Sequence, residues 1–503
     1  MASPRASGAL NEGNVEEILA RSLRVLAALS VVSAVTSLTF FHPDEHHQVV
    51  EFAGFKLGFT RADELPWEYA ARIRPWLQPA LYTLLGKLLL ALGLEDRFLL
   101  LAGFRLATAA IAIAALARLS RVAVRELPSE RMRRAYAALL PWVGFFPYLF
   151  ARTSSETLSG ACLAVAVSLA WDTRTFGWRE ASVCGVFLGL AFEARFQSAF
   201  ASVGLVAWLA VVRRVSALRL GGLVGGGVLV LACAAVVDRW GYGAWVFPPL
   251  AYVRENLVNG VANTFGRDPF WAYPVLVVVN VFAPLAVACV AAAGVAAVRF
   301  PRHVSTFVLV PFVVAHSLVA HKEERFLFPL AFLVPVLLVL AFVTRREGPV
   351  FPRPLRAALA LSLVVMVAQL VRPLGFRAQF HFARALAEAP LAGDVAIVLP
   401  GSEYPRYPFL RTNELHLEPL AGACLPASTT LVYGESPVLA LPPSCNGEPL
   451  AAEVVASELP FVHHESWART AAAFTARWNA LRSRGLPLPW LHFATLARVA
   501  PKG

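Results

Sequence analysis

The fold is decided by the run His42-Pro43-Asp44-Glu45-His46-His47-Gln48, which directly follows the apolar segment Val25–Phe41. Together with the helical turn that precedes it, this segment is long enough to span a membrane. Pro43 fixes its own φ and disfavours a helical His42, so the sequence predicts that the first membrane helix ends here. The polar run is then expected on a turn, or at the start of a new helix, where the chain leaves the bilayer.

The side chains of this run allow three interpretations. A carboxylate held at a membrane face beside imidazoles is a candidate general base. The run is also compatible with a simple polar cap on a membrane helix. A metal site is the third alternative, because zinc and iron bind the ligand types supplied by His42, Asp44, His46 and His47.

A second ionic run favours the functional interpretation. His321-Lys322-Glu323-Glu324-Arg325-Phe326 separates two apolar stretches, 307–320 and 326–343. Two dense ionic clusters at the ends of membrane helices are costly unless they line a shared polar cavity. We therefore expect both runs to serve one function on the same side of the membrane.

These two runs carry a family resemblance. HPDEHHQ resembles the HPDE signature of the lipid-phosphate-mannose-dependent mannosyltransferases of glycosyltransferase family 22, and HKEERF resembles the HKE-x-RF signature of that family. LPWEYAARIRPWLQP (65–79) and NTFGRDPFWAY (263–273) resemble the branch that adds the third mannose to glycosylphosphatidylinositol (GPI) precursors. The resemblance extends from about residue 25 to about residue 345.

The resemblance implies a GT-C fold and a reaction. Such enzymes take mannose from a polyprenyl-phosphate-mannose donor, invert the anomeric centre and form an α-linkage, with no cofactor and no metal. Asp44 matches the family's catalytic base, and Glu45 is expected to orient it or share its acidity. His321, Lys322 and Arg325 match the second signature and are expected to bind the donor phosphate. The remaining expected substrate contacts are His42, His46, Gln48, Trp67, Arg74, Arg152 and Trp271.

Arg195 is a further candidate for the donor phosphate. It lies two residues after Glu193 within an apolar region. Either the two side chains neutralise each other locally, or Arg195 faces a phosphate. The nearby glycines, Gly221, Gly222 and 225–227, lack the Lys-Ser/Thr that ends a phosphate-binding loop, so we expect them to permit close helix packing.

Composition indicates an all-α polytopic membrane protein. The 503 residues are 57% hydrophobic and 16% charged, with a mean hydropathy of +0.60. The net charge of +12 is typical of basic cytoplasmic loops rather than nucleic-acid binding, for which the chain has no motif. No cleavable signal is evident at the N-terminus. Abundant Ala, Val, Leu and Arg with little Lys suggest a high-GC bacterium, hence an inner-membrane protein with a periplasmic active site (the ER lumen if eukaryotic).

Charge distribution predicts the topology. We expect about eleven spans, with the N-terminus inside and the segment 77–93 lying on the membrane rather than crossing it. The predicted inner loops then hold seventeen Lys and Arg and the outer connections after residue 98 hold six. The first span is placed near 23–41. The others are placed near 98–117, 135–151, 157–171, 181–198, 199–212, 220–238, 272–298, 304–320, 326–343 and 355–372.

Two domains are expected. Residues 1–373 form the transmembrane catalytic domain, with an extracytoplasmic loop at 42–97. Residues 374–503 are richer in proline and contain short β-prone runs at 395–399, 431–433 and 438–441, which predicts a small extracytoplasmic α+β domain. In an oxidising compartment, Cys424 and Cys445 of this domain are a candidate disulfide.

Three functions remain in competition at this point. The first is a membrane mannosyltransferase whose partners are the polyprenyl-phosphate-mannose donor, membrane lipids and a glycolipid or lipid-linked glycan acceptor. The second is a lipid-linked transferase for another sugar, such as arabinofuranose or glucose. The third is a flippase or transporter of lipid-linked sugars, but internal repeats and broken helices near mid-membrane are expected for transporters, and no repeat is found here.

Overall fold

The computed structural model describes most of the chain. The described residues are 4–36, 40–281, 283–343, 349–371, 395–398, 407–410, 416–420, 422–426, 429–434, 441–457, 473–477, 479–480, 483 and 495–501. They divide into two compact units. The first unit comprises Met1–Thr36, Pro66–Leu94 and Leu99–Val371. The second comprises Ser37–Leu65, Glu95–Phe98 and Arg372–Gly503.

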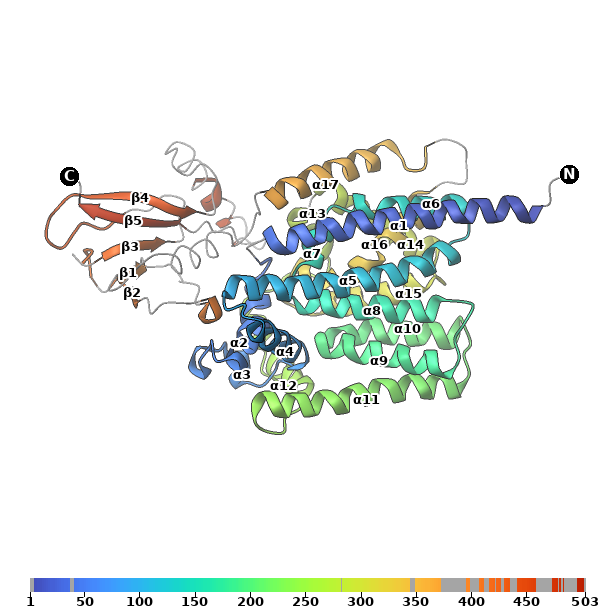
Figure 1. Ribbon diagram of the computed structural model, residues 1–503, viewed down its shortest axis with the longest axis horizontal. Helices are drawn as coiled ribbons and strands as arrows, with labels where there is room; N and C mark the ends of the chain where they lie inside the picture. The colour runs from blue at the N-terminus through green and yellow to red at the C-terminus, as the bar shows by residue number, and fades with distance from the viewer. Residues whose placement is uncertain are drawn as a thin grey trace. The chain divides into compact units, whose positions relative to one another are not determined.

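The first unit is a helical bundle. Figure 1 shows α8, α9, α10 and α11 running side by side, as their packing contacts require. The described α-helices that lie wholly or mostly in this unit are α1 (Pro4–Thr36), α3 (Trp67–Ala70), α4 (Leu77–Ala91), α5 (Arg97–Glu126), α6 (Glu130–Leu139), α7 (Phe146–Phe150), α8 (Ser155–Trp171), α9 (Trp178–Ala194), α10 (Ala199–Val211), α11 (Ala217–Tyr242), α12 (Pro248–Val253), α13 (Ala272–Asn280), α14 (Ala283–Arg299), α15 (Val304–Leu318), α16 (Val334–Phe342) and α17 (Arg353–Val371). Short 3-10 or π turns connect several of them.

Glycines bring α9 and α11 into backbone contact. A Cβ atom added to Gly185 would lie 1.8 Å from the carbonyl oxygen of Leu223, and one added to Gly226 would lie 2.1 Å from that of Ser182. Neither position accepts a side chain without separating the two helices. The glycine-rich run therefore serves close helix packing, as predicted, rather than phosphate binding.

Within the described residues, four helices are long and apolar enough to cross a membrane, and a fifth span is added if the pair α14–α15, bent by 115°, counts as one. They are Asn14–Thr36 within α1, α5, α11 and Glu324–Phe342. The eleven predicted spans stay a prediction. Two of them are interrupted, because Pro141 and Pro147 divide 135–151 into α6, a 3-10 turn (Leu140–Trp142) and α7, and an extended Val281 separates α13 from α14.

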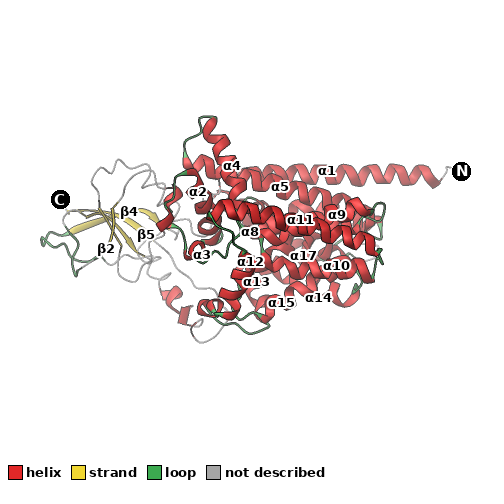
Figure 2. Ribbon diagram, turned by 90° about the horizontal axis from the view of Figure 1, so that it is seen from below, coloured by secondary structure: helices red, strands yellow, loops and turns green. Residues whose placement is uncertain are grey.

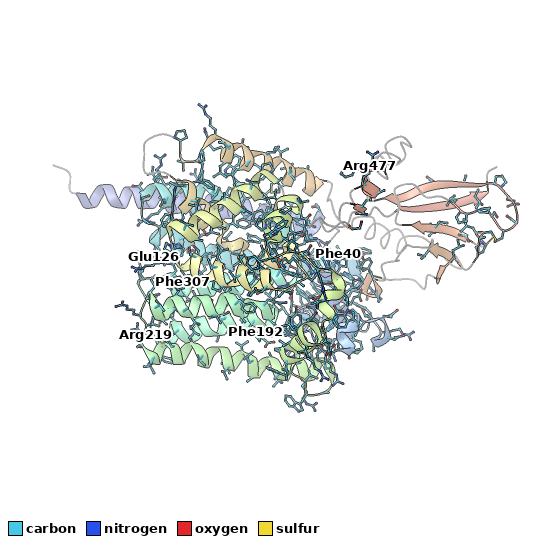
Figure 3. The ribbon with its side chains drawn as sticks, turned by 180° about the vertical axis from the view of Figure 1, so that it is seen from behind. Phe40, Glu126, Phe192, Arg219, Phe307 and Arg477 are labelled. Atoms are coloured by element: carbon cyan, nitrogen blue, oxygen red, sulfur yellow. A yellow bond between two sulfur atoms is a disulfide. The ribbon has the colours of Figure 1, made fainter. Side chains whose placement is uncertain are left out.

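Several of the predicted inner loops meet at one end of the bundle. Arg125 donates to the Asp172 carboxylate at 2.6 Å, and the Thr173 hydroxyl donates to Glu126 at 2.8 Å. Arg213 donates to the Asp172 carbonyl at 2.6 Å. Figure 3 shows Glu126 and Arg219 at this end, with Phe192 of α9 nearer the opposite end. Three of the loops, 118–134, 172–180 and 213–219, are thus joined by hydrogen bonds, and their sidedness stays a prediction.

The second unit contains helix and sheet. Its N-terminal part holds a π-helix (His46–Val50), α2 (Glu51–Leu57) and a 3-10 turn (Ala62–Glu64). The sheet has the order β2-β1-β3-β5-β4. β1 is parallel to β2 and β3, and β5 is antiparallel to β3 and β4. Figure 2 shows these strands in yellow. Their bounds are β1 (Val395–Val398), β2 (His416–Pro419), β3 (Thr429–Gly434), β4 (Leu450–Ser457) and β5 (Thr495–Pro501).

The C-terminal predictions can be compared with this sheet in part. β1 and β3 lie where β-prone runs were predicted, whereas most of the run 438–441 falls outside the described residues. Cys424 and Cys445 are joined by a disulfide, as their predicted location in an oxidising compartment allowed.

Candidate active site

The run 42–48 folds as a turn that enters a helix. The backbone N–H groups of His46 and His47 both donate to the Pro43 carbonyl at 2.9 Å, and that of Glu45 donates to the His42 carbonyl at 3.2 Å. The helix therefore begins just after Pro43, one of the two arrangements that the sequence allowed. The turn belongs to the second unit, and the HKEERF run belongs to the first.

The two acidic residues of the turn have different surroundings. Glu45 is 4% exposed, and its carboxylate accepts a hydrogen bond from the backbone N–H of Phe41. The Asp44 side chain is 30% exposed. The Nδ1 atom of His42 accepts the Asp44 backbone N–H at 3.2 Å and lies 3.5 Å from the Asp44 carboxylate. Asp44 is thus the carboxylate of this turn that an external hydroxyl reaches more readily, whereas Glu45 holds the turn's backbone.

The buried carboxylate of Glu51, which was not among the predicted site residues, holds the turn through His46. Glu51 is fully buried and accepts a hydrogen bond from His46 Nε2 at 2.8 Å and from the Thr60 hydroxyl at 2.6 Å. The backbone N–H of Phe409 donates to its two oxygens at 3.2 and 3.0 Å. His46, expected to contact substrate, is 1% exposed and is instead engaged with Glu51. Among the described residues, no group of three or more His, Cys, Asp or Glu is placed to hold a metal ion.

An aromatic residue from the C-terminal segment packs on the same turn. The Tyr407 ring stacks on His47 at 5.4 Å between centroids and meets His46 edge-on at 4.8 Å. Burial first, and then the neighbouring His46, lower the pKa of His47 to about 4. His47 is therefore neutral at physiological pH and acts here as a packed aromatic ring.

The cationic cluster of the first unit is built around Glu156. Its Oε1 atom lies 2.7 Å from Arg195 Nη1 and 3.5 Å from Arg325 Nη1. Both guanidinium groups also lie over the Phe326 ring, at 4.8 and 5.3 Å from its centroid. Arg195 therefore pairs with Glu156 of a neighbouring helix. The alternative of a local pair with Glu193 is wrong.

The other residues of the HKEERF run hold one another. Arg325 Nε donates to Glu323, which also lies 2.8 Å from His321 Nε2. Lys322 donates to the backbone carbonyls of Val319 and Asp268, and the Asp268 N–H donates back to the Ala320 carbonyl at 2.8 Å. Burial lowers the pKa of Lys322. An ammonium has three N–H groups, so a ligand anion can still accept from Lys322.

The remaining predicted contacts are scattered within their own units. Gln48 is buried in the second unit and Arg152 in the first, where its guanidinium lies 4.3 Å from the Tyr148 ring centroid. Arg74 lies 3.5 Å from Glu68. Trp67 and Trp271 are exposed to 43% and 58%. The structure brings Arg195 and Arg325 together around Glu156, and the roles of the other predicted contacts stay predictions.

Residues 22–388 match the model of the Alg9-like mannosyltransferase family. The chain belongs to this family. GPI mannosyltransferase 3 of Yarrowia lipolytica is 28% identical over 75% of this chain and 72% of its own length. Mannosyltransferase APTG1 of Arabidopsis thaliana is 27% identical over 62% of this chain and 56% of its own length, so the chain spans little more than half of that relative.

The fold has a solved counterpart. ArnT from Cupriavidus metallidurans, in its crystal structure bound to undecaprenyl phosphate, aligns with a TM-score of 0.50 at 13% identity, over 82% of this chain and 86% of that one. This likeness concerns the fold alone, and it agrees with the GT-C architecture expected from the motifs. Family and fold together make the chain a membrane glycosyltransferase of the mannosyltransferase family.

Proposed function

We propose that the protein is an inverting mannosyltransferase that uses polyprenyl-phosphate-mannose and forms an α-linkage to a hydroxyl of a glycolipid or lipid-linked glycan. The observation that carries this proposal is the partly solvent-exposed Asp44 carboxylate on a turn that the buried Glu45 and His46 side chains hold in place. A hydroxyl is a poor nucleophile at neutral pH, and a positioned carboxylate supplies the base that it lacks.

The proposed reaction is a single displacement. The acceptor oxygen attacks C1 of mannose from the face opposite the phosphate while Asp44 takes the hydroxyl proton. The bond between C1 and the phosphate oxygen breaks with its electron pair, and polyprenyl phosphate leaves as an anion. One proton moves to the carboxylate, one glycosidic bond forms and one breaks, so the step needs no cofactor.

The proposed phosphate contacts come from the cationic cluster. Arg195 and Arg325 are held by Glu156 and by the face of Phe326, which fixes both guanidinium groups before a ligand arrives. The hydrogen bonds of Lys322 go to backbone carbonyls, which do not neutralise its charge. Preorganised cations of this kind stabilise the charge that develops on a leaving phosphate. Of these cations, we assign Lys322 the largest part in stabilising the negative charge of the leaving phosphate.

The proposed acceptor class rests on the names of the relatives. Because several are named GPI mannosyltransferase 3, we propose a GPI-like glycolipid or a related lipid-linked glycan as acceptor. For a bacterial source, the proposed site faces the periplasm across the inner membrane; for a eukaryotic source, it faces the ER lumen.

A transfer assay with purified protein tests this function. The protein is incubated with radiolabelled polyprenyl-phosphate-mannose and a panel of glycolipids, and the product is digested with linkage-specific α- and β-mannosidases. We expect a labelled lipid from which α-mannosidase releases the labelled mannose. Transfer only from GDP-mannose or from a polyprenyl-phosphate donor of another sugar would overturn the donor assignment, and a product released by β-mannosidase would overturn inversion.

A further inference from the structure

Several buried polar atoms in the first unit have no hydrogen-bond partner among the described residues, and four of them belong to residues beside the cationic cluster. They are Arg195 Nε, Ser198 Oγ, Tyr273 Oη and His316 Nε2. Their residues are between 0% and 7% exposed, so bulk water does not satisfy them. A buried polar atom without a partner is destabilising. A group of such atoms around one aromatic ring therefore calls for a bound partner.

Shared neighbours bring these residues together. The His316 ring lies 6.4 Å from the Tyr273 ring and 6.4 Å from the Phe326 ring, between centroids. Arg195 lies over the same Phe326 ring, at 4.8 Å, and Ser198 follows Arg195 in the next 3-10 turn. The residues come from α13, α15 and the segment between α9 and α10. Three separate stretches of sequence thus converge beside the cation cluster.

The hydrogen bond of His316 defines what its free nitrogen can do. His316 Nδ1 lies 2.8 Å from the backbone carbonyl oxygen of Phe312. A carbonyl oxygen only accepts, so Nδ1 carries the proton, and Nε2 of the neutral imidazole presents a lone pair. This atom requires a donor. A phosphate oxygen is an acceptor and does not satisfy it, whereas a hydroxyl does.

The other groups complete a set that suits a sugar. Ser198 and Tyr273 carry hydroxyls that donate and accept, and Arg195 donates. Phe326 adds an apolar ring face next to these polar atoms. A hexose presents the same combination, because its hydroxyls donate and accept while its C–H face is apolar. We propose that Ser198, Tyr273 and His316 bind hydroxyls of the donor's hexose, beside the phosphate contact of Arg195.

This inference rests on the proposed function and assigns its sugar subsite. It also provides a source of selectivity. A site built to bond a hydroxyl discriminates strongly against an analogue that lacks it, because the protein's buried groups are then left without partners. Tyr273 and His316 are therefore expected to decide which hydroxyl pattern the enzyme accepts.

Paired changes in enzyme and donor test the subsite. We would measure kcat/KM for polyprenyl-phosphate-mannose and its 2-, 3-, 4- and 6-deoxy analogues with wild type, Tyr273→Phe and Ser198→Ala. A lost neutral hydrogen bond is expected to reduce kcat/KM about 3- to 10-fold. For at least one deoxy analogue, the variant should lose less kcat/KM than the product of the two separate reductions. The enzyme change and the donor change then remove the same hydrogen bond, which can be lost only once.

A matched histidine pair sharpens the result. His316→Asn retains a donor near the Nδ1 position for the Phe312 carbonyl but loses the group at Nε2. His316→Gln retains a polar group near Nε2 instead. We expect His316→Gln to keep more activity than His316→Asn. Tyr136→Phe serves as control, because Tyr136 is fully buried, bonds Ser120 at 3.0 Å and lies outside the cluster.

The outcomes separate the two claims. If wild type transfers no mannose from the parent donor, the proposed function fails and the subsite fails with it. If wild type transfers mannose but the losses multiply for every analogue, only the subsite is refuted, and the four atoms bind water. If a histidine variant does not fold, the tyrosine and serine variants still decide the question, because each removes a single hydroxyl.

Discussion

Replacing Glu51 with Gln should loosen the turn that carries Asp44. The carboxylate bonds His46 at 2.8 Å, Thr60 at 2.6 Å and the Phe409 N–H at 3.0 Å. A glutamine keeps the size but replaces one acceptor oxygen with an NH₂ group, which faces donors. Each buried donor left facing this NH₂ group costs about 1–3 kcal/mol, so two such donors cost about 2–6 kcal/mol together. Thr60→Val removes only one hydrogen bond to a charged group, at a cost of about 1.5–3 kcal/mol.

Hydrogen exchange at the Phe409 amide measures this effect directly. A loss of about 3 kcal/mol corresponds to about 10²-fold faster exchange, since each 1.4 kcal/mol is a factor of ten. Mass spectrometry of peptides that contain Phe409 should show this acceleration in Glu51→Gln and a smaller one in Thr60→Val. Exchange in Glu51→Gln equal to that of wild type would refute the reasoning, as would a larger effect of Thr60→Val.

Three further predictions concern other parts of the chain. Glu156→Gln should raise the donor KM at least several-fold, because the Arg195 and Arg325 guanidinium groups lose their shared carboxylate; donor titration of initial rates would show this. Gly226→Leu should lower the thermal midpoint markedly, because its side chain would collide with the backbone of α9. Gly225→Leu places its side chain in open space and should leave the midpoint unchanged in differential scanning calorimetry. Because the pKa of His47 is lowered from 6.5 to about 4, wild type should lose stability as pH falls through this window, and His47→Gln should lose less over the same pH series.

The sequence predicted local features better than contacts between distant residues. Asp44, Lys322 and Arg325 stand out as candidates because charged residues at the ends of apolar segments are costly and because they match two short motifs, and their roles stay predictions. The helix start after Pro43 and the packing role of the glycines also follow from local rules. These features depend on residues close in sequence, and the structure agrees with them.

The missed contacts join residues distant in sequence. Glu51 bonds a backbone amide more than 350 residues away, and nothing in its own surroundings distinguishes it from a helix-surface glutamate. Arg195 pairs with Glu156 of α8 rather than with its neighbour Glu193, a choice made by helix packing alone. The breaks at Val281 and after Leu139 likewise interrupt predominantly apolar runs, so hydropathy did not reveal them.

The most direct test of the account is transfer by Asp44→Asn, compared with Asp63→Asn. Asparagine keeps the size of the side chain but removes its capacity to accept a proton. General-base contributions are about 10²–10⁴-fold, so Asp44→Asn should reduce transfer from polyprenyl-phosphate-mannose at least ~10²-fold while donor binding persists. Asp63→Asn changes an exposed carboxylate that pairs with Arg61 and should leave transfer near that of wild type. Near-normal transfer by folded Asp44→Asn would contradict the central claim.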